Sequence, residues 1–111
     1  MLSLSGTVPL NLDSERTTDG VTTVYTVPLT GFSDGAVVKG AVSLTTSTEK
    51  NCSYEITIHK HNNIGGKVAV VSSYAYGSLS INFSMTFTTL TITLSEAIVG
   101  NLKIALYQLN Y

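Results

Sequence analysis

The segment AVVKGAVSLTTSTEKNCSYEITIH (residues 36–59) contains two runs in which apolar side chains recur at every second position. The apolar positions are Ala36, Val38, Val42 and Leu44 in the first run, and Cys52, Tyr54, Ile56 and Ile58 in the second. Alternation with a period of two places every apolar side chain on one face of a β-strand. The polar stretch TSTEKN between the runs predicts a turn. The segment therefore predicts two strands that each bury one face.

The same pattern recurs on both sides of this segment. We expect strands at residues 8–12, 21–27, 36–45, 52–59, 67–74, 81–87, 90–94 and 102–111. Polar loops are expected at residues 13–20 and 28–35, each ending in Asp-Gly, a turn signal. The alternation breaks at Thr88-Thr89, which indicates either a tight turn or a β-bulge. About eight strands with no helical periodicity predict an all-β fold: a single antiparallel β-sandwich, jelly-roll-like.

The length and composition of the chain limit the number of domains and the kinds of binding partner. A chain of 111 residues suits one domain, residues 1–111. The net charge of −1 and the scattered Lys and Arg residues predict no binding of nucleic acid. No apolar run approaches the roughly 18 residues of a membrane span, so we expect no membrane insertion. Charged residues make up only 12% of the chain, and this favours a subunit of an assembly over a free monomer.

Two of the expected strands, at residues 67–74 and 102–111, are apolar on both faces. A strand in a two-layer sandwich has one covered face, so a second apolar face needs another cover. With no helix expected, that cover is another subunit, and we predict a homo-oligomer, most simply a trimer. The residues expected at the interface are Tyr107, Leu109, Tyr111, Ala69 and Val71.

Three segments of the sequence support a resemblance to a known class of protein. They are GAVVKGAVSLTT, SYEITIHK, and the ending TTLTITLSEAIVGNLKIALYQLNY, in which a Ser/Thr-rich strand, a short loop and a last strand run to the C-terminus. From residue 35 or so to the end, the chain resembles the distal β-sandwich of bacteriophage tail spikes and tail fibres. The resemblance implies a trimer that serves in assembly, in glycan recognition, or in both. The chain departs from those proteins in length, since tail spikes are long chains.

The sequence carries no catalytic motif, and we expect no enzymatic activity. The carboxylates are spread along the chain, mostly in expected loops, although a pair for glycoside hydrolysis could still meet in space. Cys52 is the only cysteine, and a small buried side chain is its expected role.

A glycan site is one prediction for the turn regions. Tyr74 and Tyr76 lie beside the expected turn in YAYGS, and tyrosine rings are rigid amphipathic platforms for sugar rings. Asn62 and Asn63 supply amide donors and acceptors in another loop. The alternative is that the tyrosines cover the edge of the core or a subunit seam.

His59 and His61 are spaced two residues apart and share a strand face with Glu55 and Thr57. Such a pair can chelate a metal ion, and three copies around a trimer axis would present six imidazoles. The resemblance implies such an axial site, because similar histidines line the axis in some phage fibre tips. The alternative is an exposed pair that leads into a turn. No cofactor is expected apart from this metal ion.

These observations together predict a non-enzymatic viral structural protein of the virion. It is expected to be the trimeric receptor-facing or assembly domain of a phage tail spike or fibre, and its external partner would be a cell-surface polysaccharide. The alternatives are a capsid decoration protein and a free carbohydrate-binding module.

Overall fold

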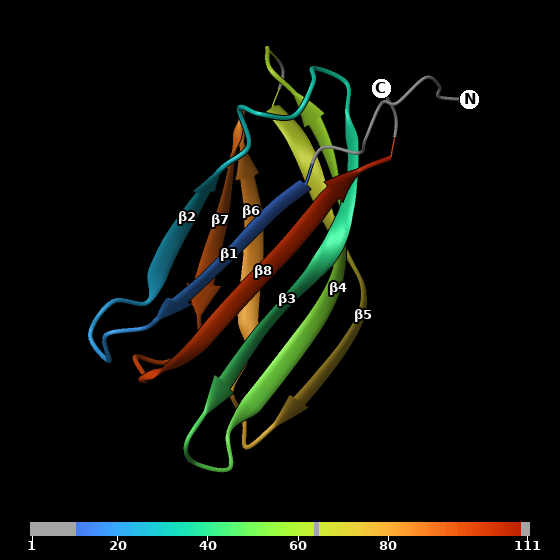
Figure 1. The fold of residues 1–111 in the computed structure, drawn as a ribbon. Helices are drawn as coiled ribbons and strands as arrows, with labels where there is room; N and C mark the ends of the chain where they lie inside the picture. The colour runs from blue at the N-terminus through green and yellow to red at the C-terminus, as the bar shows by residue number, and fades with distance from the viewer. Residues whose placement is uncertain (1–10, 64, 110–111) are drawn as a thin grey trace.

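The computed structural model describes residues 11–63 and 65–109, which form two packed β-sheets (Figure 1). The strands are β1 (Asn11–Thr17), β2 (Val24–Pro28), β3 (Val37–Thr46), β4 (Asn51–His61), β5 (Gly65–Tyr76), β6 (Ile81–Thr86), β7 (Thr89–Leu94) and β8 (Gly100–Gln108). The predicted all-β sandwich is confirmed. None of the described residues forms a helix long and apolar enough to cross a membrane.

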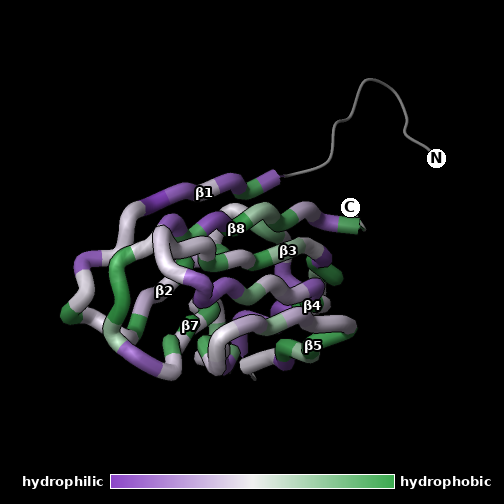
Figure 2. Tube along the Cα trace, turned by 90° about the horizontal axis from the view of Figure 1, so that it is seen from below, coloured by the Kyte–Doolittle hydropathy of each residue, from purple (hydrophilic) through white to green (hydrophobic). Residues whose placement is uncertain are grey.

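The larger sheet has the strand order β1-β8-β3-β4-β5, and the smaller sheet has the order β2-β7-β6. Every pair of neighbouring strands is antiparallel. Seen from below, β1, β8, β3, β4 and β5 follow one another in one layer, with β2 and β7 in the other (Figure 2). The first strand pairs with the last and the second with the seventh, which is the rolled-up connectivity of a jelly roll. The β4–β5 hairpin then widens the larger sheet.

The core lies between the two sheets and is built from the alternating positions of each strand. The buried apolar residues include Val38, Val42, Leu44, Cys52, Ile56, Ile58, Leu90, Ile92, Leu94, Leu102, Ile104 and Leu106. The cross-strand register places them opposite one another, as in the pairs Val38 with Ile58 and Val42 with Ile104. The face predicted for residues 36–59 is therefore the face that is buried.

The prediction of a loop at residues 13–20 is wrong for residues 13–17, because β1 occupies Asn11–Thr17, and only residues 18–20 lie in a loop. This strand lacks the apolar alternation of the others, and only Leu12 packs against the core. It is held by its ladder with β8, in which Leu12 pairs with Leu106 and Glu15 with Lys103. An edge strand with exposed charged residues is common in natural sheets, and alternation alone does not reveal it. Val8 and Leu10, which were predicted to begin this region, lie outside the described residues.

The strand predicted at residues 21–27 begins later, at Val24. The cause is Asp19, whose carboxylate accepts hydrogen bonds from the backbone N–H groups of Val21 and Thr22, at 2.8 and 2.6 Å. These bonds hold residues 19–22 in a turn and remove the two N–H groups from any ladder. Nearby, the buried Thr18 Oγ1 donates to Ile98 O at 2.5 Å and ties this turn to the loop before β8.

The break in alternation at Thr88-Thr89 is a tight turn and not a bulge. Thr86 pairs with Thr89, so only Phe87 and Thr88 connect β6 to β7. Phe87 has a φ of 51°, in the left-handed region that the first central residue of a two-residue hairpin can require.

The strand β5 is longer than predicted and is the most exposed strand of the larger sheet. A β-bulge at Val71 shifts its register against β4, because Glu55 pairs with Ser72 while Ile56 pairs with Val70. The smaller sheet has fewer strands than the larger one, so the inward side of β5 is only partly covered. Val70 and Val71 are 48% and 55% exposed. The two apolar faces predicted for this strand thus both reach the surface.

Candidate functional site

The side of the larger sheet that points away from the smaller sheet is the outer face of the molecule's widest layer. Its side chains lie in rows that run across the strands, as the registers define. One row consists of Tyr107, Lys39, Thr57 and Ala69; the next consists of Asp13, Ala105, Ala41, Glu55 and Ser72; the third consists of Glu15, Lys103, Ser43, Ser53 and Tyr74. We call this surface the outer face.

The middle of the outer face is hollowed because its side chains are small. Ala41, Ala105, Ser43 and Ser53 form the floor, while longer side chains stand around them. One open hollow of about 440 Å³ is lined by Asp13, Ser14, Glu15, Ala41, Ser43, Lys103, Ile104 and Ala105. A second, of about 290 Å³, is lined by Ala41, Ser53, Tyr54, Glu55, Ser72, Ser73 and Tyr74. Both border Ala41, and we call the pair the central hollow.

Three carboxylates face the central hollow from strands rather than from the loops in which most were predicted. Glu15 accepts a hydrogen bond from Asn101 Nδ2 at 2.7 Å, and Glu55 accepts one from Ser72 Oγ at 3.2 Å. Asp13 and Glu55 stand at the two sides of one row, three strand spacings or about 14 Å apart between Cα atoms. Exposed carboxylates beside Ser hydroxyls can accept hydrogen bonds from a hydroxyl-rich ligand.

The four residues predicted as a glycan site are not brought together. Tyr74 and Tyr76 belong to β5 itself, before the turn at Gly77, and both rings are exposed. Asn62 and Asn63 lie in the turn at the opposite end of β5, and the backbone N–H of Asn62 donates to Asp34 Oδ1 at 2.9 Å. The extended strand between the two pairs spans roughly 30 Å. Of the four, only Tyr74 borders the central hollow.

The histidines lie where the alternation predicted. β4 continues through His61, and His59 is exposed on the outer face, opposite Lys67 of β5. His61 is half-buried. Among the described residues of one chain, no three metal-ligating side chains come close enough to hold an ion. An axial site would need copies from other subunits, so it stays a prediction.

The predicted interface residues within the described part of the chain are all exposed. Tyr107 and Ala69 face outward from β8 and β5 in the same row, and Leu109 follows directly after β8, where its N–H donates to Val37 O at 2.8 Å. Val71 is the bulged residue of β5 and is also exposed. Tyr111 lies outside the described residues.

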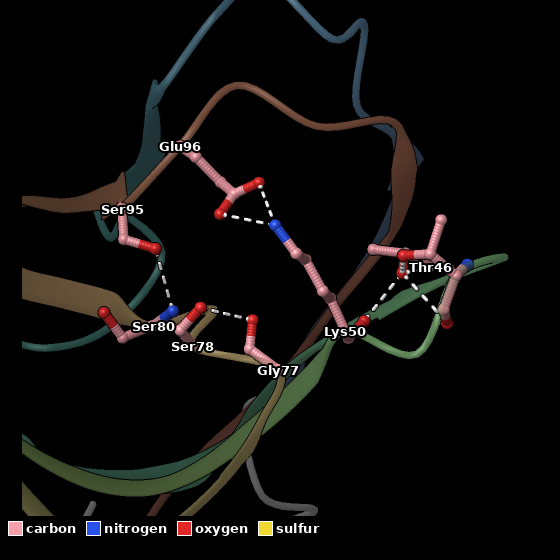
Figure 3. A network of polar contacts seen from close by, with 8 residues as sticks. Thr46, Lys50, Gly77, Ser78, Ser80, Ser95 and Glu96 are labelled. Carbon is pink, nitrogen blue, oxygen red and sulfur yellow. Dashed lines mark hydrogen bonds and ion pairs between the residues drawn. The ribbon is translucent and has the colours of Figure 1, made fainter.

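The end of the sandwich opposite the β4–β5 turn is closed by a polar network (Figure 3). Lys50 Nζ contacts both carboxylate oxygens of Glu96, at 2.8 and 3.0 Å, and so links the β3–β4 turn to the loop before β8. Thr46 Oγ1 donates to Lys50 O at 2.7 Å within the same turn. The ion pair is partly exposed, so it links the two loops but contributes at most about 1 kcal/mol to stability.

Cys52 packs in the core, as predicted, and burial raises the pKa of its thiol above the usual value. The thiol therefore stays protonated at neutral pH, which is unfavourable for a nucleophile.

Asp13 and Glu15 were predicted to lie in a loop, and their place beside Ala105 and Ala41 was missed. Only the pairing of β1 with β8 reveals it.

Comparisons with known proteins address the fold. No protein-family model matches the sequence, and no curated protein matches it either. Among solved structures, the fold is similar to part of the tailspike protein of Acinetobacter phage vB_ApiP_P1, with a TM-score of 0.52 and 8% sequence identity. The match covers 88% of this chain and 21% of the tailspike chain, so the chain spans about a fifth of that protein's length. At this identity the likeness is one of fold: the sandwich is built like a portion of a phage tailspike.

Proposed function

We propose that this chain is a non-enzymatic structural domain of a phage tail, a component of the virion that assembles as a homotrimer at the distal, receptor-facing part of a tail spike or fibre. The similarity of its fold to part of a phage tailspike supports the tail assignment. The observation that carries the proposal is the exposure of apolar side chains on both β5 and the end of β8, on a chain with few charges.

The outer face supports self-association. Tyr107, Leu109 and Val71 keep between 44% and 55% of their surface exposed in the single chain. These exposed apolar side chains lie at two places of one sheet, on β8 and on β5, and a second copy is the simplest partner that a homo-oligomeric virion component offers them. In the trimer these residues contact neighbouring copies, and the histidines of β4 lie nearer the axis.

The test compares two substitutions of exposed aliphatic residues. Leu109→Asp places a carboxylate in the proposed contact, and we expect the trimer to dissociate, because an unpaired buried carboxylate is unfavourable by several kcal/mol. Val99→Asp is the matched control, since Val99 is also exposed but lies in the loop before β8. Light scattering after size exclusion measures both. Equal masses for the two variants would contradict the role of Leu109.

A second candidate function, glycan binding, is favoured by the central hollow. Tyr74 offers an aromatic ring at its border, and Asp13 and Glu55 offer acceptors for sugar hydroxyls. Glycan binding is compatible with a tail domain and equally with a free carbohydrate-binding module. A capsid decoration protein would need neither the aromatic ring nor the carboxylate acceptors.

A glycan array tests the second candidate. We expect bacterial surface polysaccharides to be bound, and Tyr74→Ala to abolish that binding while Tyr76→Ala preserves it. The non-enzymatic part of the proposal has its own readout. Release of reducing sugar from a bound polysaccharide, lost in Glu55→Gln, would overturn it.

A further inference from the structure

Four strands lie at the edges of the two sheets, and β6 is the one without protection. Within the described part of the chain, β1, β5, β2 and β6 each pair with a strand on one side only. Charged residues, prolines and bulges protect a free edge, because they hinder its pairing with another chain. β1 carries charged residues such as Asp13, β5 carries Lys67 and a bulge, and β2 ends in Pro28. β6 is regular and contains no charged residue and no proline.

The peptide groups of Phe83 and Met85 face the free side of β6. The N–H of Leu94 on β7 donates to Thr23 O, on the side of β2, at 2.7 Å, so Leu94 and its partner Ile81 on β6 form a non-hydrogen-bonded pair. Hydrogen-bonded and non-hydrogen-bonded pairs alternate along an antiparallel ladder, so Phe83 and Met85 belong to non-hydrogen-bonded pairs as well. Their N–H and C=O groups therefore point away from β7 and can pair with a further strand.

The larger sheet extends past β6 at this edge. At one edge of the sandwich Arg16 of β1 lies over the ring of Tyr25 of β2. Towards the other edge the rings of Tyr54 on β4 and Phe83 on β6 meet edge to face, with 5.2 Å between their centres. β5 follows β4 and has no described strand beneath it, and Val70 on its inward side is 48% exposed. The space beside β6 and beneath β5 is wide enough for one more strand, and we call it the open position.

The chemistry of the open position specifies the strand that fits it. Phe83, Met85 and Val70 give it an apolar inner side. On the outer side of β6, Asn82 and Ser84 are short, uncharged and exposed. A matching strand has apolar residues at every second position and short polar residues between them. It carries no charge on its inner side, because a charge beneath β5 would be buried without a partner.

The segment before β1 has this pattern. Residues 2–10, LSLSGTVPL, contain no charged residue and alternate with a period of two. One side of an extended chain would carry Leu2, Leu4, Gly6, Val8 and Leu10, and the other would carry Ser3, Ser5, Thr7 and Pro9. These residues lie outside the described part of the chain. Their alternation is the only strand pattern of the sequence that the two described sheets do not already use.

Within its own chain the segment begins on the far side of the sandwich. Asn11 is the first residue of β1, and β1 lies four strand spacings from β5, or about 19 Å. An extended chain needs about six residues to cross this distance, which leaves too few to pair along the six residues of β6. The same segment of a neighbouring copy does not have to follow that path.

We infer that residues 2–8 of one copy add to β6 of the next copy as a fourth strand of its smaller sheet, with Leu2 and Leu4 beneath β5. The added strand would pair with the free peptide groups of β6 and cover Val70. The segment and the open position are different surfaces, so the contact is head-to-tail and can close a ring of three copies. The inference rests on the proposed homotrimer and names an element that its copies exchange.

Charged substitutions on the two sides of this contact test it in the full chain. Leu2→Asp/Leu4→Asp brings carboxylates beneath β5, and Val70→Lys brings an ammonium group into the open position. We expect each variant to raise the dissociation constant of the trimer by about tenfold or more, measured by sedimentation equilibrium. In the combined triple variant the new charges attract one another, so we expect a smaller increase than the product of the two separate effects.

Two matched controls add the same charges elsewhere. Ser3→Asp/Ser5→Asp places the carboxylates on the other side of the segment, and Thr26→Lys places an ammonium group at an exposed position of β2. We expect both to leave the dissociation constant within about twofold of the wild type. Circular dichroism shows whether each variant is folded, and Val70→Lys changes a side chain that is already half exposed.

The outcomes separate the inference from the proposed function. A wild-type trimer that is insensitive to Val70→Lys or to Leu2→Asp/Leu4→Asp would overturn the exchange and leave the trimer standing. The same conclusion would follow if the two effects simply multiplied in the triple variant. A wild-type monomer would overturn both the exchange and the trimer, and coupling of the two substitutions in its free energy of unfolding would place the segment in its own chain.

Discussion

At the scale of single residues, Lys60 shows how the end of β4 is fixed. It continues the buried side of β4 after Ile58, and its side chain is only 2% exposed, with Nζ donating to Phe32 O at 2.5 Å. The backbone of Lys60 also bonds to Ala36 O and to Gly35 N, so the residue anchors the loop at 29–36. Gln108 holds the same loop through Ser33, whose N–H donates to Gln108 Oε1 at 3.2 Å.

Replacing Lys60 separates its aliphatic stem from its ammonium group. Lys60→Met keeps most of the packing and removes the buried ammonium group. Within the described part of the chain, this group forms no ion pair with a carboxylate. We therefore expect the free energy of unfolding of Lys60→Met to lie within about 1 kcal/mol of that of the wild type. Lys60→Ala also removes the stem, and we expect a loss of roughly 2 to 3 kcal/mol. Urea unfolding measures both. Equal losses would show that the ammonium, and not the stem, holds the loop.

Asp19 gives a pH dependence. The pKa of Asp19 is lowered from 3.8 to about 2, and the largest cause is the hydrogen bond from the Thr22 backbone. A lowered folded-state pKa contributes stability that is fully present above the unfolded pKa and is lost as the pH falls through the folded one. We therefore expect the melting temperature of the wild type to exceed that of Asp19→Asn at pH 6, and the difference to shrink between about pH 4 and pH 2. A difference that stays constant over this range would contradict the turn's role.

At the scale of elements, the alternation of apolar and polar residues identified the strands that have one buried face. It failed for a strand that has no buried face. β3 and β4 were predicted with the correct buried side, because each carries apolar residues at every second position. The strand predicted at residues 8–12 overlaps only the start of β1, and the continuation of β1 to Thr17 was missed because the backbone ladder with β8, and not its own side chains, holds it in the sheet. The site was missed for a related reason. Asp13, Ala105, Ala41 and Glu55 form a row only once the partners and the register of four strands are known.

Proximity in sequence also misled the grouping of Asn62 and Asn63 with Tyr74 and Tyr76. The four residues lie within fifteen positions of the chain, but β5 is extended and separates the two pairs by roughly 30 Å. Distances along a strand grow with every residue, so only residues in adjacent rows of the sheet form a site.

Gly40 tests how closely β3 and β8 approach. A Cβ atom at this position would collide with Ala105 O and would lie 2.8 Å from Leu106 Cα, both backbone atoms that cannot rotate away. We expect Gly40→Ala to lower the free energy of unfolding by about 2 kcal/mol or more, because the two strands must separate. Gly31→Ala is the control: a Cβ atom added there would have no described neighbour within 4 Å, and we expect a change within about 0.5 kcal/mol. Similar losses in the two variants would argue against a close contact.

At the scale of the whole molecule, two sheets of unequal width explain the surface. Five strands face three, so the core is closed over β8, β3 and β4 but leaves β5 and its valines partly uncovered. The same inequality gives the outer face its breadth, and the small side chains in its middle form the central hollow. The fold is similar to part of a phage tailspike, and in the trimer proposed above other copies would cover part of these surfaces.

The mass of the wild-type protein in solution tests this account most directly. Light scattering after size exclusion, repeated over a range of concentrations down to about micromolar, determines the number of chains without reference to shape. The account predicts three times the mass of the 11.8 kDa chain at every concentration above the dissociation constant. A single species of 11.8 kDa throughout that range would contradict it.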